Sequence, residues 1–176
     1  MRYYLIAGEP SGDLHGANLM KGLKAHDPEA KFRFWGGDKM AGVGGSGNLA
    51  KHYKETSFFG LVEVIKNLRS IRRQMKGCRQ DVGALAPHVL ILVDYPGFNM
   101  KMARWAKEHG IRVFYYIAPK VWAWREWRVK AIRKYVDELF IIFPFERDYF
   151  PKHGIRPIFE GNPLVDAIEA RRASLP

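Results

Sequence analysis

The chain has 176 residues, enough for one sizeable domain, and carries 29 Lys and Arg against 18 Asp and Glu, a formal net charge of +11. Cys78 is the only cysteine, which excludes an intrachain disulfide, and no secretory cleavage pattern opens the sequence, so we expect a cytoplasmic protein. No stretch approaches the ~18 uncharged apolar residues of a membrane-spanning helix, and the charge calls for a polyanionic partner: nucleic acid, anionic lipid or a phosphorylated substrate.

Short apolar runs rich in β-branched and aromatic residues alternate with amphipathic segments along the chain. In chain order we expect a strand at Tyr3–Ala7, a helix at Leu14–His26, a strand at Lys31–Trp35, a helix at Leu61–Lys76, a strand at Val89–Val93, a helix at Met100–His109, a strand at Val113–Ile117, a helix at Val121–Tyr135, a strand at Leu139–Phe143, a helix at Glu146–His153 and a strand at Pro157–Phe159. Strands that are apolar throughout are typical of burial on both faces. The order therefore predicts an α/β fold, a doubly wound, mostly parallel, Rossmann-like sheet.

Two stretches stand apart from this pattern. Gly36–Gly47 contains six glycines and is expected to be flexible, and Arg171–Pro176 carries no folding signal. Neither stretch is a repeat or a linker in the middle of the chain, so we expect a single domain.

Polar segments follow the predicted strands at a consistent place, just after each strand ends. They are Gly8–Asp13, Asp94–Asn99, Ala118–Lys120, Pro144–Glu146 and Gly161–Pro163. Because the carboxyl ends of parallel strands share one edge, where open α/β sheets bind ligands, we predict a cleft there.

Gly8–Asp13 is the most informative of these segments when read alone, and it leaves two alternatives open. Its backbone N–H groups, hydroxyl and carboxylates suit ligand contact at a strand-to-helix turn. Ser11 or Asp13 could equally cap the helix expected to begin near Leu14.

Several motifs occur in collinear order over about Met1–Asp166. They are Gly8–Asp13, Phe59–Glu63, Asp94–Asn99, Tyr115–Arg125, Pro144–Glu146 and Gly161–Asp166. With these motifs the chain resembles the lipid-A-disaccharide synthase family, GT-B-type glycosyltransferases of bacterial lipid A biosynthesis. Pro119–Arg125, with two tryptophans around an alanine, is the most specific part of the match.

The resemblance implies an inverting hexosyltransferase that moves 2,3-diacylglucosamine from its UDP derivative to 2,3-diacylglucosamine 1-phosphate, giving a β-1,6-linked disaccharide 1-phosphate and UDP. It implies that residues 1–166 are the N-terminal, acceptor-side Rossmann-like domain and 167–176 a linker or chain end. The C-terminal UDP-sugar-binding domain of the family is absent from the sequence, so we expect this chain alone to be inactive.

Asp94 is our first choice for the general base of such a transfer. It follows the most apolar strand, where a carboxylate facing a partly dry cleft has the raised basicity that a base needs. The structural alternative is an Asx turn, or a cap on the helix after Pro96.

The expected substrate-binding residues gather around the same edge. They are Glu9, Ser11, Gly12, Asp13, Asn99, Trp122 and Arg125. Glu9 suits sugar hydroxyls better than phosphate, and Asn99 would orient either Asp94 or a sugar, or else face solvent. Arg125 and Arg128 suit anionic groups, but a solvated basic face explains them equally, as ordinary packing explains the tryptophans.

The helix expected at Leu61–Lys76 combines an apolar stripe with a dense run of cations, and both core packing and contact with a membrane or an acyl chain explain it. The residues expected to make membrane or acyl contact are Phe59, Val62, Val64, Ile65, Leu68 and Ile71. The cations are Lys66, Arg69, Arg72, Arg73, Lys76 and Arg79. Diacylated substrates are drawn from a bilayer, so we expect a peripheral protein on the anionic inner face of the bacterial inner membrane.

No metal site is indicated, because the six histidines are scattered and Cys78 stands alone, and no cofactor is indicated either. No nucleophile motif occurs, so we do not expect covalent catalysis. Two further hypotheses compete with the transferase: a basic nucleic-acid-binding module, which the absence of a reading motif disfavours, and a non-catalytic lipid-binding domain. The sequence leaves open whether the chain forms a homo-oligomer.

Overall fold

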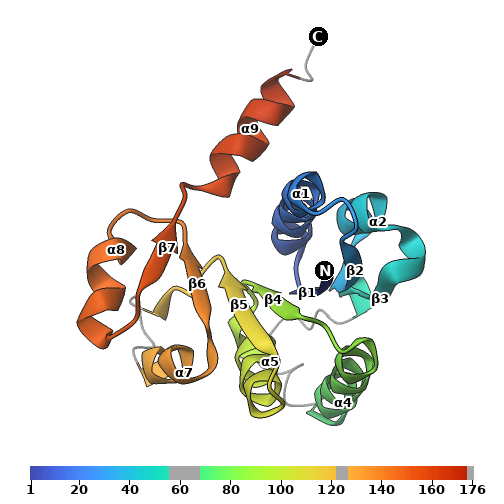
Figure 1. The fold of residues 1–176 in the computed structure, drawn as a ribbon, viewed down its shortest axis with the longest axis horizontal. Helices are drawn as coiled ribbons and strands as arrows, with labels where there is room; N and C mark the ends of the chain where they lie inside the picture. The colour runs from blue at the N-terminus through green and yellow to red at the C-terminus, as the bar shows by residue number, and fades with distance from the viewer. Residues whose placement is uncertain (56–67, 122–126, 174–176) are drawn as a thin grey trace.

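The computed structural model describes residues 1–55, 68–121 and 127–173, and over these residues one seven-stranded sheet forms the centre (Figure 1). The strand order is β3-β2-β1-β4-β5-β6-β7, and all neighbours run parallel. The strands are β1 (Arg2–Ala7), β2 (Lys31–Gly36), β3 (Leu49–His52), β4 (Val89–Val93), β5 (Arg112–Tyr116), β6 (Glu138–Ile141) and β7 (Pro157–Phe159). The doubly wound α/β prediction is confirmed, with the six expected strands present.

Strand β3 was not predicted. It is a short edge strand with no β-branched residue, and all four of its residues are half-buried, so it lacks the apolar pattern that marks the others. Pairing with β2 places it in the sheet.

The described helices are α1 (Pro10–His26), α2 (Asp38–Gly44), α4 (Leu68–Leu85), α5 (Pro96–Glu108), α7 (Trp127–Tyr135), α8 (Glu146–Tyr149) and α9 (Pro163–Ala173), with short 3-10 turns η1 (Ser46–Asn48), η2 (Tyr53–Glu55) and η3 (Phe150–His153). Two of the described helices, α2 and α9, were not predicted, and the others differ from the expected ranges at their ends. Helices α1 and α5 begin earlier than predicted because each starts on a proline, whose fixed φ suits the first helical position.

Helices cover the sheet in two layers. Figure 1 shows α4, α5 and α7 on one face and α1 and α2 on the other. Alternate residues of each central strand enter the two cores: Tyr4 and Leu92 face α4 and α5, whereas Leu5 and Val93 face α1 and α2. Burial on both faces explains why β4 is apolar throughout.

Helix α2 corrects the expectation that Gly36–Gly47 is flexible. Its Met40 is fully buried, and a Cβ on Gly16 or Gly36 would lie 2.8 Å or 2.4 Å from the Met40 sulfur. Glycines therefore let α2 pack closely against α1 and β2. Tertiary packing outweighs the low helix propensity of this segment.

Helix α9 was not predicted, and it runs through Ala173, within the stretch 167–176 that was expected to be a linker or chain end. It projects from the end of the sheet (Figure 1), and Leu164, Val165 and Ile168 on it are among the most exposed large apolar residues described. The domain boundary at residue 166 stays a prediction.

Candidate active site

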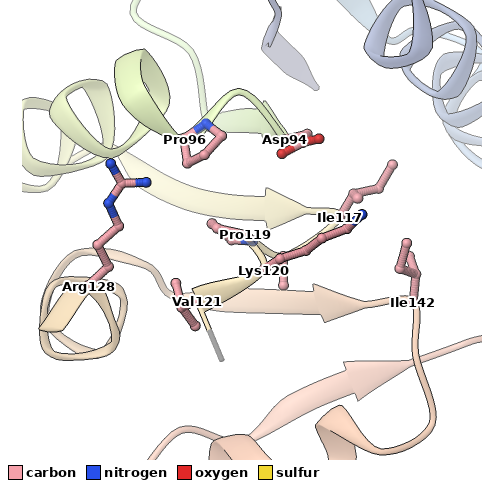
Figure 2. Close-up of a pocket in the computed structure, with 9 residues that line it drawn as sticks. Asp94, Pro96, Ile117, Pro119, Lys120, Val121, Arg128 and Ile142 are labelled. Atoms are coloured by element: carbon pink, nitrogen blue, oxygen red, sulfur yellow. The ribbon is translucent and has the colours of Figure 1, made fainter. Parts of the chain in front are cut away.

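The loops after β4, β5 and β6, together with Arg128 of α7, line a pocket of about 210 Å³ at the carboxyl edge of the sheet (Figure 2), the edge where a cleft was predicted. The segments Gly8–Asp13 and Gly161–Pro163, which were also expected there, contribute none of its described lining residues. The pocket is lined by Asp94, Pro96, Ile117, Ala118, Pro119, Lys120, Val121, Arg128 and Ile142. Asp94, the residue expected to act as the general base, therefore contributes a carboxylate to the lining of this pocket.

The backbone around this pocket is strained. The φ angle is 43° at Asp94, 49° at Tyr95 and 65° at Ile117, in the left-handed region that non-glycine residues rarely adopt. Such residues cost of order 1–3 kcal/mol each and persist where the surroundings hold them. The ends of β4 and β5 are therefore held in an unusual geometry.

Two buried side chains hold the strained turn at Asp94. The Asn99 amide donates hydrogen bonds to the carbonyl oxygens of Ile6 and Val93, both at 3.3 Å, and to that of Asp94 at 2.8 Å. The Tyr115 hydroxyl donates to the same Asp94 carbonyl at 2.7 Å. The ends of β1, β4 and β5 are thereby tied together around Asp94.

Asn99 is fully buried, so it does not face solvent. Of the alternatives considered from the sequence, orientation of Asp94 fits the structure, through the Asp94 backbone. A direct contact of Asn99 with substrate stays a prediction.

Burial is the main reason that the pKa of the Asp94 carboxyl is raised above its ordinary value of 3.8, and the nearby negative charge of Glu9 raises it further. A backbone hydrogen bond from Tyr95 and the positive charge of Lys120 act in the opposite direction. The N-cap of α5 is Tyr95, with no side-chain capping bond. Asp94 therefore has the environment expected of a general base. The hydrogen bond from the Tyr95 backbone is the one feature that matches the other possibility, an Asx turn or helix cap.

Asp13 has a structural role in this fold, and its predicted contact with substrate stays a prediction. It is buried in α1 and its carboxylate accepts backbone hydrogen bonds from Gly37 at 2.7 Å, Met40 at 3.0 Å and Lys39 at 3.1 Å. These N–H groups belong to the first turn of α2 and its N-cap, so Asp13 caps α2 instead of α1. Both oxygens of the Asp13 carboxylate thus accept hydrogen bonds from the backbone.

The other residues of the first loop divide between surface and packing. Glu9 and Ser11 are exposed at the carboxyl edge, and Glu9, the N-cap residue of α1, makes no side-chain capping bond there. Gly12 is buried, and a Cβ on it would lie 3.2 Å from the Ala7 Cβ. A Cβ on Gly8 would lie 2.4 Å from the Tyr95 ring, so this glycine lets β1 approach the strained turn.

Several expected site residues fall outside the described residues. These are Phe59, Val62, Val64, Ile65, Trp122 and Arg125. Leu68 begins α4, and Ile71 is half-buried beside a pocket between α4 and α5.

Sequence reasoning missed Tyr115 and gave Lys120 no role. Tyr115 sits at an inward position of β5, and the one sequence signal for it was a tyrosine in a buried strand, whose hydroxyl needs a partner. Lys120 lies beyond the end of β5, and only the loop geometry brings its charge near Asp94.

The described residues contain no group of three or more His, Cys, Asp or Glu side chains arranged to hold a metal ion. In residues 1–55, 68–121 and 127–173, no helix has the length and apolarity to cross a membrane.

The fold and the site at its carboxyl edge define a Rossmann-like domain of the GT-B type. Solved structures of that type are similar in fold. One is UDP-GlcNAc 2-epimerase from Neisseria meningitidis bound to UDP-GlcNAc, which superposes with a TM-score of 0.66 at 11% sequence identity. The match covers 97% of this chain and 49% of that one. UDP-GlcNAc 2-epimerase from Methanocaldococcus jannaschii gives a TM-score of 0.63 and 14% identity over 95% and 47%.

The family model described as lipid-A-disaccharide synthetase matches residues 3–175, and the chain belongs to this family. It is 42% identical to a lipid-A-disaccharide synthase of Coxiella burnetii over 93% of the chain and to one of Geobacter sulfurreducens over 95%. The matched segment is 43% of each relative's length, so the chain spans less than half of these relatives.

Proposed function

We propose that this chain is the acceptor-side part of an inverting glycosyltransferase. The reaction transfers 2,3-diacylglucosamine from UDP-2,3-diacylglucosamine to the 6-hydroxyl of 2,3-diacylglucosamine 1-phosphate. The products are the β-1,6-linked disaccharide 1-phosphate and UDP. Membership of the lipid-A-disaccharide synthase family supports this choice of substrates.

In the proposed step the acceptor 6-oxygen attacks the anomeric carbon of the donor sugar from the face opposite UDP. A carbon–oxygen bond forms to the acceptor, the bond from the anomeric carbon to the diphosphate breaks, and Asp94 takes the proton of the hydroxyl. UDP leaves with the bonding electron pair. One displacement inverts the configuration, so no covalent sugar intermediate is needed.

The observation that carries the proposal is the combination of cavity, burial and charge at Asp94. Its carboxylate lines the pocket and has a raised pKa, while Asn99 and Tyr115 hold its backbone. A base held in one geometry needs no reorganisation when the hydroxyl arrives.

Exposed Glu9 and Ser11 border the same edge, and we propose that they contact acceptor hydroxyls, with Glu9 also raising the basicity of Asp94. Trp122 and Arg125 remain predicted substrate contacts from the family motif. Membership of a glycosyltransferase family favours this function over a nucleic-acid-binding module.

The first experiment measures disaccharide formation from the two diacylated substrates, with the chain alone and with a C-terminal domain of a relative supplied separately. We expect product only when both parts are present. Folded chain that yields no product in either mixture, with a complementing domain shown to bind UDP, contradicts the proposal and favours the non-catalytic lipid-binding alternative.

The role of Asp94 is tested in the complemented enzyme. Asp94→Asn should reduce turnover by at least 10³-fold, in line with loss of a general base, without loss of folding. Exposed Asp148→Asn is the matched control and should leave turnover unchanged. Near-normal turnover of Asp94→Asn removes this residue from the mechanism.

We further propose that α4 places the protein peripherally on the anionic inner face of the bacterial inner membrane. Arg69, Arg72, Arg73 and Lys76 are exposed on α4. They adjoin a groove of about 480 Å³ between α4 and α5, lined by Ile71 and Met75 among basic residues. Cations with adjacent apolar surface suit lipid phosphates and acyl chains.

Vesicle binding tests this localisation. Changing Arg69, Arg72 and Arg73 to Gln should abolish most binding to vesicles containing phosphatidylglycerol. Changing exposed Lys31, Lys152 and Arg156 to Gln removes the same charge elsewhere and should weaken binding less. Equal binding by the two triple variants excludes a specific role for α4.

A further inference from the structure

Arg128 gives the pocket a second charged end that the proposed chemistry does not use. It comes from α7, and Figure 2 shows its guanidinium pointing toward Pro96, the first residue of α5. Asp94 and the end of the Lys120 side chain lie on the other side of the pocket, toward Ile117. The pocket therefore has an arginine side chain on one side and a carboxylate on the other.

The charge balance inside the pocket favours an anion. Among its described lining residues Lys120 and Arg128 are cationic and Asp94 is acidic. The first turn of α5, which borders the Arg128 end, contains no acidic residue, and the partial positive charge of a helix N-terminus adds to that of the guanidinium. The guanidinium and the helix N-terminus both favour an anionic group at this end.

The size of the cavity restricts the ligand further. At about 210 Å³ it is smaller than the clefts of about 300–1,000 Å³ that enclose drug-sized ligands. It suits a polar headgroup, not the acyl chains of a diacylated sugar.

We propose that Arg128 holds the phosphate of a sugar phosphate in this pocket while a hydroxyl of the same sugar meets Asp94. The inference rests on the proposed function, in which the acceptor carries both groups, and it names the subsite that orients the acceptor. A guanidinium donates two parallel hydrogen bonds to a phosphate, so it fixes direction as well as position. The acceptor is thereby presented with its hydroxyl toward the base.

Binding is measured on the chain itself by amide NMR titration with glucosamine 1-phosphate and with glucosamine. We expect the phosphorylated sugar to bind at least tenfold more tightly, with shifts at Asp94 and in the first turn of α5. Arg128→Gln should lose that tenfold preference, and Arg128→Lys should keep part of it. Exposed Lys130→Gln on the same helix is the control and should stay within twofold of the unchanged chain.

Equal affinity for the two sugars, or an unchanged preference in a folded Arg128→Gln variant, overturns the subsite. If Arg128 variants fail to fold, the wild-type titration still decides, because shifts that avoid the α5 first turn contradict the proposal.

The complemented enzyme separates this inference from the reaction itself. Arg128→Gln should raise KM for diacylglucosamine 1-phosphate about tenfold and leave KM for the dephosphorylated acceptor unchanged. If Arg128→Gln forms the disaccharide with both KM values unchanged, the subsite is wrong and the proposed reaction is still supported. Arg128-dependent binding without disaccharide formation keeps the subsite and overturns the reaction.

Discussion

The buried carboxylate of Asp13 provides the sharpest test of the structure, because stability can be measured on the chain alone. Asp13→Ala removes the acceptor of three backbone hydrogen bonds, two of them in buried surroundings. A hydrogen bond to a charged group contributes about 1.5–3 kcal/mol, but neighbouring bonds do not add fully and water can reach the Lys39 N–H. We therefore expect the free energy of unfolding to fall by about 3–5 kcal/mol.

Asp13→Asn is a milder change at the same site. The amide oxygen can still accept from Gly37 and Met40, while its NH2 group faces the Lys39 N–H, so we expect a loss of about 1–3 kcal/mol. Asp38→Asn is the control in the first turn of α2. Its carboxylate is 82% exposed, with His52 and Lys54 at 3.5 and 3.8 Å, and the loss should stay below about 1 kcal/mol.

The assay is urea unfolding followed by circular dichroism, with hydrogen exchange of the Lys39 and Met40 amides as a local readout. Both amides should exchange faster in Asp13→Ala. A loss below about 1 kcal/mol at an unchanged m-value would refute the capping role and leave substrate contact as the predicted role of Asp13.

Further predictions concern the turn at Asp94 and the buried thiol. Gly8→Ala places a Cβ against the Tyr95 ring and should destabilise the chain by about 1–3 kcal/mol in urea unfolding, whereas a neutral effect would mean that the ring moves freely. Glu9→Gln removes a negative charge that raises the pKa of Asp94, so carboxyl NMR titration should give a lower pKa and a base form that persists to lower pH; an unchanged or higher value contradicts this electrostatic coupling. Cys78 is fully buried and burial raises the pKa of its thiol, so it should react with a thiol reagent only as fast as the chain opens, and prompt stoichiometric labelling would count against this packing.

Much of the architecture could be predicted because its signals are local. The apolar run Val89–Val93 predicted a strand buried on both faces, and β4 lies at the centre of the sheet. The position of Asp94 after that strand predicted a carboxylate at the ligand-binding edge, because parallel strands end together. The collinear motifs, with Pro119–Arg125 as the most specific, indicated the family that the comparison then confirmed.

The remaining features depend on contacts between distant segments. Asp13 stabilises α2 from another helix, so the glycine-rich stretch became a helix although its own composition disfavours one. The sequence left Asn99 open between a partner of Asp94 or a sugar and a solvent-facing amide, and the structure shows its NH2 group bonded to main-chain carbonyls of β1 and β4.

Hydrophobic periodicity and turns within a few residues were enough to predict six of the seven described strands, the parallel sheet and the edge at which polar residues collect. Which polar residues of that edge face a cavity, and which bond to the backbone, depended on tertiary packing. Asp94 and Arg128 line the pocket, whereas the Asp13 carboxylate and the Asn99 NH2 group are buried in hydrogen bonds to main-chain groups. Most buried polar groups find hydrogen-bond partners, and the partners available to each are set by the packing of segments far apart in the chain.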